Sequence, residues 1–537
     1  MNRSLIQPGE ISIFGEMKTC QVHDMILDFL VSKAVEENFT TIIGVHNVAH
    51  EPEKKVRRLS PQDKSADDAI REEDSSQHIV LENKNIYHPF LPLRLINRPI
   101  PDLKIPEDLI VSHVRSLTLF GTVRDLHPFQ RCRLLRVLDL HNCIILSRDY
   151  LIDFGYLIFL KYFSIKGTVV DVIPNNISEL QNLETLNITN VKGCYKIPAT
   201  MVQLGRLVTL HVERELPDGI GGMKALQVLK KVNVFKQTTN FVQEIGQLTN
   251  LRSLHITVAT VFSRYAENKE ENMKMMVSAI CNLGRYDLHS IRIDITDELD
   301  IEFFQESWWH SPPISLHKLV VKLAKISRVP RWMGSLVNLH KLFFPMKEVR
   351  QADLVILGGL PALLYLFLPV EGRVSAGPAG GRVRISGSHG FPSLRLFQIG
   401  GDVCALGLVF DVRCMPKLQR LEFEFNAWET NHLTIGCFSF GIEQLSSLTS
   451  AFCRIVYVGA TNDTFQQVEA ALEEARSTHP NNPRFTRCSH PTRSQMIKKA
   501  RKEEKRQVHE LTESEEEEYE GSDYKKYLKL IKFQYNG

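Results

Sequence analysis

A recurring frame of apolar residues constrains this chain more than any other feature. The frame places apolar side chains at positions i, i+3, i+6 and i+8, and leucine is its commonest occupant. Copies begin at Leu157, Leu180, Leu204, Leu248, Leu336, Leu360, Phe391 and Met415. The starts at 157, 180 and 204 are 23 and 24 residues apart, and later intervals are longer and uneven. Because one copy cannot bury its apolar side alone, neighbouring copies have to stack.

This spacing is typical of leucine-rich repeats and predicts an α/β fold, a leucine-rich-repeat solenoid. The last two positions of each frame alternate as a short strand, and the first two fill the core from the preceding turn. Stacked strands then form one curved parallel sheet on the concave face. An apolar anchor followed by a proline turns the chain onto the convex side at Ile173-Pro174, Ile197-Pro198, Leu216-Pro217 and Val329-Pro330.

The residues between the strand positions, and just after them, are predicted to point outward onto the concave face. We expect them to bind a protein partner, because stacked strands present many side chains on a rigid scaffold. The alternative is a strand face that meets only solvent. The candidate partner-binding residues are Asp139, His141, Ser164, Lys166, Asn187, Thr189, His211, Glu213, His255 and Thr257.

Composition argues against several other kinds of partner and site. Lys and Arg total 65 against 62 Asp and Glu, and a net charge of +3 indicates neither nucleic acid nor an anionic membrane as the partner. The cysteines form no zinc-type spacing, which predicts no metal site, and Cys143 is predicted to be a buried ladder residue of the repeat. No segment resembles a signal peptide or a membrane span, so we expect a cytoplasmic protein.

The two ends of the chain differ from the repeats. Strands at 11–14 and 18–22, followed by a helix over 25–35 capped by Asp24, indicate a partial winged-helix domain over residues 1–50. The repeats follow over 51–478, with an exposed polar loop at 61–78. Residues 479–537 form a charged tail, predicted to be disordered or helical.

The tail holds two further candidate signals. A basic cluster begins at Lys498 and suggests nuclear import, and Ser514 lies among glutamates in a pattern that resembles an acidic-directed phosphorylation site. The alternative for both is a solvated tail whose opposite charges screen one another.

Several motifs together resemble the plant intracellular immune receptors, the nucleotide-binding leucine-rich-repeat disease resistance proteins of the coiled-coil class. Asn2-Arg-Ser-Leu-Ile-Gln-Pro and Val22-His23-Asp24-Met25 resemble the end of that family's nucleotide-binding module, the NB-ARC, with Val in place of Met in its Met-His-Asp motif. Further matches are Lys55-Val-Arg-Arg-Leu-Ser, Leu135-Arg-Val-Leu-Asp-Leu and Val329-Pro-Arg-Trp-Met. The resemblance covers about residues 1 to 483.

The resemblance implies roles for two residues near the N-terminus. In that family the motif histidine contacts the β-phosphate of bound ADP, so His23 would be a nucleotide sensor and Asp24 its support. From the residues alone, a His-Asp pair at a helix start is more often a cap. No G-x-x-x-x-G-K-[ST] loop occurs in the 537 residues, so the chain resembles the C-terminal part of a receptor. We expect no cofactor for this chain, while ADP or ATP is implied for a full-length receptor.

These features predict a non-catalytic recognition protein of plant defence, either a fragment or a natural truncated form. Its repeats would bind a pathogen effector, a guarded host protein or the receptor's own nucleotide-binding module, or would regulate the receptor switch. The alternative is a standalone repeat scaffold for signalling or ubiquitin-ligase complexes that uses no nucleotide. No G-x-S-x-G, H-E-x-x-H or P-loop motif occurs, so we predict no enzyme activity.

Overall fold

The computed structural model describes most of residues 113–490. Gaps lie at 120–121, 124–131, 142, 146–155, 171–172, 194–195, 260–268, 296–301, 378–380 and 388–389. Before residue 113 it describes the backbone of four short strands, β1 (Ile6–Pro8), β2 (Cys20–Val22), β3 (Thr41–Ile43) and β4 (Arg58–Pro61). The predicted helix at 25–35, most of the predicted loop at 61–78 and the tail beyond 490 lie outside the described residues.

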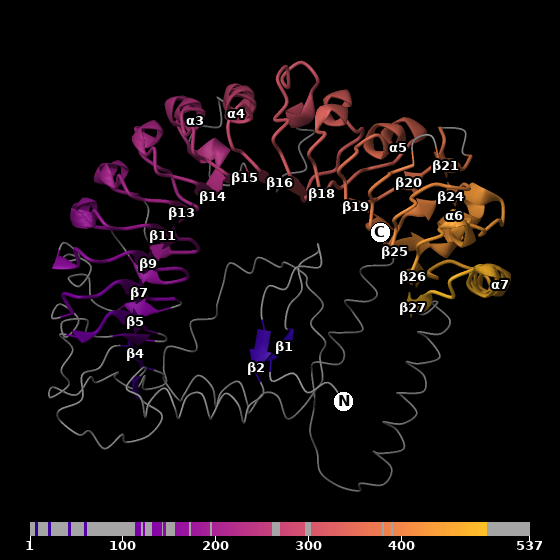
Figure 1. Cartoon of the computed structure of the whole chain (residues 1–537), viewed down its shortest axis with the longest axis horizontal. Coiled ribbons are helices and arrows are strands. Elements are labelled where there is room, and N and C mark those ends of the chain that lie inside the picture. The colour runs from indigo at the N-terminus through magenta and orange to yellow at the C-terminus, as the bar shows by residue number, and fades with distance from the viewer. Residues whose placement is uncertain are drawn as a thin grey trace, which may run out of the picture.

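One long parallel sheet organises the molecule. Each strand pairs with its neighbour in parallel, so that the frame leucines meet in register, as Leu186 of β11 meets Leu210 of β13. Figure 1 shows these strands lining the inner side of an arc, which confirms the predicted curved sheet on the concave face. From β5 onward they are β5 (Ser116–Thr118), β7 (Val137–Asp139), β9 (Tyr162–Ser164), β11 (Thr185–Ile188), β13 (Thr209–Val212), β14 (Val228–Asn233), β15 (Ser253–Val258), β16 (Ser290–Ile295), β17 (Lys318–Lys322), β18 (Lys341–Phe343), β19 (Tyr365–Pro369), β22 (Leu396–Gly400), β25 (Arg420–Asn426), β26 (Ser450–Val456) and β27 (Arg484–His490).

The apolar frame forms a single core that runs along the arc. Leu180, Leu183, Leu186 and Ile188, the four positions of one copy, are each at most 1% exposed. The predicted anchors are also buried, and the proline after three of them precedes a 3₁₀ helix: η6 (Asn175–Glu179), η7 (Ala199–Gln203) and η12 (Arg331–Ser335). The fixed φ of proline suits the residue before a helical turn.

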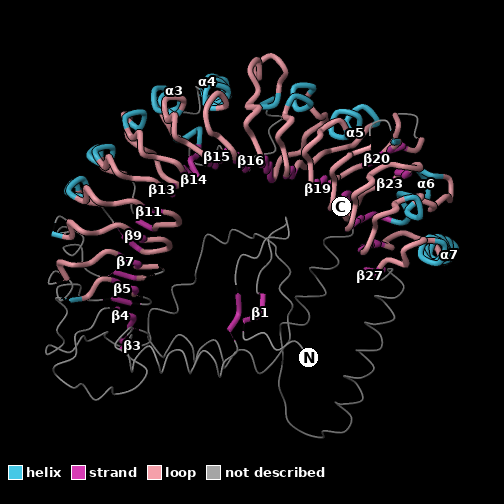
Figure 2. The backbone as a smooth tube through the Cα atoms, viewed as in Figure 1, coloured by secondary structure: helices cyan, strands magenta, loops and turns pink. Residues whose placement is uncertain are grey.

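The convex side changes along the chain. The longer repeats carry α-helices there, which Figure 2 shows on the outer side of the arc: α3 (Thr239–Ile245), α4 (Lys269–Leu283), α5 (Gln351–Gly358), α6 (Ala427–Thr434) and α7 (Asn462–Thr478). The repeat from β15 to β16 is long because it holds α4, whose Met276 and Ile280 are fully buried. Shorter 3₁₀ turns are η8 (Ile220–Gly222), η9 (Val234–Lys236), η11 (Glu302–Phe304) and η14 (Ile442–Gln444).

Small sheets lie beside the main one. A parallel ladder contains β6 (Thr122–Val123), β8 (Ile144–Ile145), β10 (Val169–Val170) and β12 (Lys192–Gly193). Two further parallel pairs join β20 (Arg373–Val374) to β23 (Ala405–Leu406) and β21 (Val383–Ile385) to β24 (Leu408–Phe410). Cys143 beside the ladder is fully buried and its thiol donates to the carbonyl of Leu119 at 3.1 Å, as predicted for a ladder residue.

Two boundaries differ from the sequence interpretation. The sheet continues through β27, which pairs in parallel with β26 up to His490, so the repeats extend past residue 478. The arginines at 484 and 487 gave this segment the composition of the tail and hid its strand pattern. Near the N-terminus, β2 pairs antiparallel with β1, so its described partner is residues 6–8, and 11–14 lie outside the described residues.

Candidate recognition surface on the concave face

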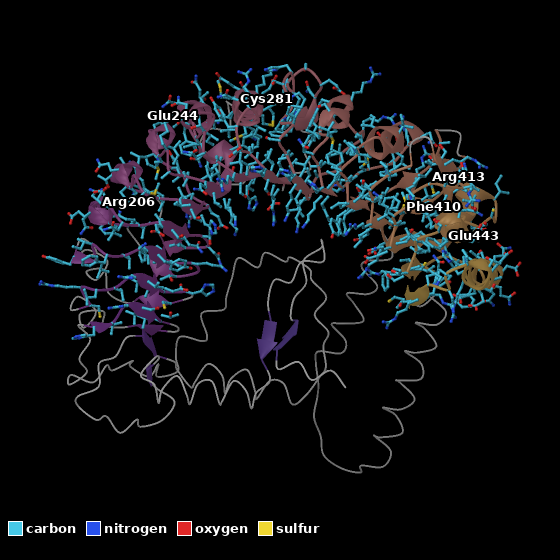
Figure 3. All side chains as sticks on the ribbon, viewed as in Figure 1. Arg206, Glu244, Cys281, Phe410, Arg413 and Glu443 are labelled. Atoms are coloured by element: carbon cyan, nitrogen blue, oxygen red, sulfur yellow. The ribbon has the colours of Figure 1, made fainter. Side chains whose placement is uncertain are left out.

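The parallel register places the outward side chains of the sheet in rows. Asn187 lies beside His211, and His211 lies beside Lys230, because each residue pairs with its counterpart on the next strand. A register shift between Leu229 and Val232 interrupts the row at β15. The row resumes at His255 and continues through Arg292, Val320, Phe343, Phe367, Gln398 and Glu422. Figure 3 shows side chains projecting from these strands into the inside of the arc, while the labelled Arg206, Glu244 and Cys281 lie on its outer part. The concave face is therefore a continuous surface built from many repeats.

The predicted partner-binding residues on the first strands form local polar contacts. The Thr189 hydroxyl donates to Asn187 Oδ1 at 2.8 Å, and Glu213 accepts from Lys231 and, at 3.0 Å, from the backbone N–H of Asn190. Ser164 and Thr189 are nearly fully buried, which the expectation of outward-pointing residues did not foresee. Lys166, in contrast, is exposed.

Two atoms of this polar region have no hydrogen-bond partner among the described residues. They are Asp139 Oδ1 and His211 Nε2, both shielded from solvent. Burial, followed by the charges of Lys230 and Lys231, the ring of His255 and the charge of Lys166, lowers the pKa of His211 to about 4. At neutral pH His211 is therefore uncharged.

An ion-paired triad joins β15 to β16 in the middle of the arc. Asp294 accepts a 2.8 Å hydrogen bond from His255 Nε2 and two more, also 2.8 Å, from the Arg292 guanidinium. Burial alone would raise the pKa of Asp294, but the hydrogen bonds from His255 and Arg292 outweigh it and lower the pKa to about 2. His255, predicted as an outward contact residue, is thus buried and held by Asp294.

Beyond the triad, the face changes from polar to apolar and basic. Val320, Phe343 and Phe367 occupy the central row on β17, β18 and β19, and Tyr365 and Leu396 pack beside them as a cluster separate from the main core. The rings of Phe343 and Phe367 stack with centroids 6.2 Å apart. Lys318, Lys322 and Lys341 border this cluster on the same strands. We call these eight residues the apolar-basic patch.

Sequence reasoning missed this patch, although a signal was present. The runs Leu342-Phe-Phe and Tyr365-Leu-Phe-Leu are continuously apolar, whereas a strand with only one buried side would alternate apolar and polar residues. A second missed feature is a ladder of histidines, with His289 on His317 at 4.7 Å and His317 on His340 at 5.0 Å between ring centroids. Burial, followed by the charges of the two neighbours, lowers the pKa of His317.

Other predicted sites remain untested. His23 and Asp24 lie outside the described residues, so their nucleotide-sensing role stays a prediction. Within the described part of the chain, no group of three or more His, Cys, Asp or Glu side chains is arranged to hold a metal ion. None of the helices in that part has the length and apolar character needed to cross a membrane.

Comparison with known proteins finds a matching family model and related sequences. A family model described as a leucine-rich repeat region matches residues 113–485. The disease resistance protein Pik-2 of rice, Oryza sativa subsp. japonica, is 26% identical over 84% of this chain and 44% of its own length. The rice disease resistance protein RGA5 is 28% identical over 89% of this chain and 39% of its own length. The chain thus spans less than half of each of these relatives.

Solved structures match as well. A leucine-rich repeat protein of Leptospira interrogans is 16% identical, covers 71% of this chain and 92% of its own length, and gives a TM-score of 0.43.

Proposed function

The chain belongs to the leucine-rich repeat region family, and from this premise we propose that it is a non-catalytic recognition protein of plant immunity. Its concave face would bind a protein ligand, which is a pathogen effector, a guarded host protein or the nucleotide-binding module of a receptor. The observation that carries the proposal is the similarity to rice disease resistance proteins along 84% to 89% of the chain.

The structure of the concave face supports a binding role. Its strands form one rigid sheet, so a ligand meets side chains already held in place and loses little free energy to their ordering. Charged and polar side chains such as Lys166, Glu213 and Lys231 are available on the first strands of this face.

Site-specific photo-crosslinking in leaf cells tests the proposal. A photo-crosslinking amino acid replaces Thr257, on the concave strand β15, and in a matched variant replaces Arg206, which lies on the outer part of the arc. We expect specific protein adducts at position 257 that change in amount when the leaf is infected, and few at position 206. Equal adducts at both positions, or none at 257 under either condition, would contradict a recognition role for the concave face.

We further propose that this chain by itself takes no nucleotide and acts in the cytoplasm. The absence of a G-x-x-x-x-G-K-[ST] loop from the sequence supports the first statement, because that loop supplies the backbone N–H groups that hold phosphates. Purified chain is expected to release no stoichiometric ADP on denaturation, and a fluorescent fusion is expected outside the secretory pathway. Bound ADP at one molecule per chain would assign His23 its sensing role after all.

A further inference from the structure

The apolar-basic patch has the burial pattern of a prepared contact surface. Val320 and Phe367 are only 4% and 2% exposed although they point away from the main core, because Phe343, Tyr365 and Leu396 cover them from the concave side. Those three covering side chains remain partly exposed to solvent. A surface cluster with a dry centre and an accessible rim resembles the centre of protein interfaces, where aromatic side chains supply most of the binding free energy.

Cations surround this cluster on both sides of the central row. The Lys322 ammonium lies 6.0 Å from the centre of the Phe343 ring, and the Lys341 ammonium lies 5.3 Å from that of Tyr365. Lys318 and Lys341 come two residues before the central row, and Lys322 comes two residues after it. Any group seated on Phe343 therefore has a lysine within reach on either side.

The charges next to the patch repel one another. Burial lowers the pKa of Lys230, and the neighbouring Lys318 and Arg292 lower it further. Burial also lowers the pKa of Lys341. A lysine whose pKa is depressed in this way is stabilised when an anion approaches, because the anion offsets both the lost solvation and the like charges.

The face supplies few carboxylates here. The strands β17, β18, β19 and β22 contain no Asp or Glu. The nearest carboxylates in the central rows are already engaged: Asp294 binds Arg292 and His255, and Glu422 binds Arg420 at 2.5 Å. The charged side chains of these four strands are thus lysines, and Lys322 lies beside Asp294 of β16 in the parallel register.

We propose that the apolar-basic patch binds an acidic segment of a protein partner that carries one or two bulky apolar side chains. The apolar side chain would pack on Phe343 and Phe367, and carboxylates on either side of it would pair with Lys318, Lys322 and Lys341. This inference rests on the proposed function, because it gives the partner of the concave face its chemistry. Charge complementarity favours an acidic protein segment over a nucleic acid, since Asp294 and Glu422 at the ends would repel a longer track of phosphates.

The repeat geometry sets the spacing of the ligand's residues. Adjacent strands lie about 4.8 Å apart, and an extended peptide advances about 3.3 Å per residue. A peptide that crosses the strands therefore places its apolar anchor and its acidic residues within about two to three residues of one another. A ten-residue peptide with a central Phe-Leu pair and acidic residues on both sides fits this requirement.

Fluorescence anisotropy with the full chain tests the proposal. The probe is a fluorescein-labelled peptide, Gly-Asp-Glu-Asp-Phe-Leu-Asp-Glu-Asp-Gly, and the matched probes replace Phe-Leu by Ser-Ser or every acidic residue by lysine. The acidic apolar probe should bind, the Ser-Ser probe at least about fivefold more weakly, and the lysine probe not at all. Binding should weaken several-fold between about 50 and about 300 mM NaCl, because salt screens exposed charges.

Two variants locate the binding. Lys318→Glu with Lys341→Glu should weaken the acidic apolar probe about tenfold or more, because two attractive contacts become repulsive. Arg206→Glu with Lys224→Glu changes the net charge equally away from the patch and should alter binding less than about twofold. Phe343→Ala, at a partly exposed position, tests the anchor without reversing charge and should weaken the probe several-fold. Circular dichroism confirms that each variant is folded.

Any of four results would overturn the proposal. The first two are a failure of the acidic apolar probe to bind at about 1 mM chain and an equal weakening of its binding by both charge-reversal variants. The other two are binding of the Ser-Ser probe as tight as that of the acidic apolar probe, and displacement of the peptide by a single-stranded oligonucleotide at a lower concentration than by unlabelled peptide. The crosslinking at Thr257 separates this failure from that of the proposed function. If crosslinks form but the peptide does not bind, the concave face recognises a protein of other chemistry, and if the peptide binds without crosslinks, only the recognition role fails.

Discussion

The two halves of the arc share an inner frame and differ on both surfaces. From β9 to β13 the repeats are short, their convex side holds the 3₁₀ helices η6 and η7, and their concave face is polar. From β17 to β27 the convex side also holds α-helices, and the concave face carries the apolar-basic patch. The frame residues are buried equally in both, as Leu186 and Leu421 are each fully buried.

This difference teaches that the frame and the surfaces are separable. The sheet needs only an apolar residue at each frame position and a fixed strand spacing, so the convex segment can lengthen from a 3₁₀ turn to the helix α4 without breaking the register. The residues that point out of the sheet between the frame positions do not need to be apolar. One half can therefore present hydrogen-bonding groups and the other an apolar contact surface on the same scaffold.

The largest expected effect comes from breaking the frame in one half at a time. Leu210→Ala on β13 and Leu421→Ala on β25 each remove a fully buried side chain and should cost about 2–5 kcal/mol of unfolding free energy. Because each repeat contacts only its neighbours, amide protection should fall in the mutated half alone. Hydrogen exchange with mass spectrometry measures this. If both variants lost protection along the whole arc, the halves would form one cooperative unit.

The ion-paired triad should give the polar part of the face a stability that acid removes. The folded pKa of Asp294, about 2, lies below its unfolded value of 3.8, so its stabilisation is present above pH 3.8 and is lost as the pH falls toward 2. At pH 5 the free energy of unfolding of the wild-type chain should exceed that of the Asp294→Asn variant by about 2 kcal/mol. Urea unfolding of both at pH 5 and pH 2.5 checks that this gap shrinks; an unchanged gap would show that the ion pairs contribute nothing.

A side-chain cap should matter more for α6 in the second half than the proline before η7 matters in the first half. Asn426 accepts hydrogen bonds from the N–H groups of Trp428 at 3.0 Å and Glu429 at 3.1 Å at the start of α6, so Asn426→Ala should cost about 1 kcal/mol. Pro198 precedes η7 without a side-chain cap, and Pro198→Ala should cost about 0.5 kcal/mol through the unfolded chain. Thermal unfolding of both variants measures the difference, and a larger loss at Pro198 would reverse the ranking.

The smallest effect concerns a single ring. His211 should titrate near pH 4 rather than near 6.5, because burial and the nearby lysines disfavour its charged form. Stability from its neutral ring is thus present above pH 6.5 and declines as the pH falls toward 4. Lys230→Met should raise the pKa of His211. Carbon-13 NMR of labelled histidine follows both titrations, and a His211 pKa unaffected by Lys230→Met would exclude the lysine as a cause.

Much of the fold was readable from sequence, because its signals are local. The frame at Leu180 or Leu204 repeats within a few residues, and prolines such as Pro174 mark the start of a convex turn next to the anchor they follow. Strand β27 was missed for the opposite reason. Arg484 and Arg487 dominate its composition, and only pairing with β26 shows that it completes the sheet.

For the concave face, too, the sequence predicted some features and only the structure showed the others. The sequence predicted that His255 and Thr189 point outward on the concave face, but both are buried, and His255 is held by Asp294 of the next strand. The link from His255 to Asp294 joins residues of two repeats separated by α4, and no local pattern announces it.

The sequence by itself determined the solenoid, its inner sheet and its polar first strands, because a short apolar period leaves stacked repeats as the way to bury it. Only the tertiary structure decided what the concave face presents. Val320, Phe343 and Phe367 stand in separate repeats of the sequence, and they form one cluster because parallel register brings equivalent positions about 4.8 Å apart. Neighbours of that kind are created by stacking, so their chemistry becomes visible only after the repeats are aligned in space.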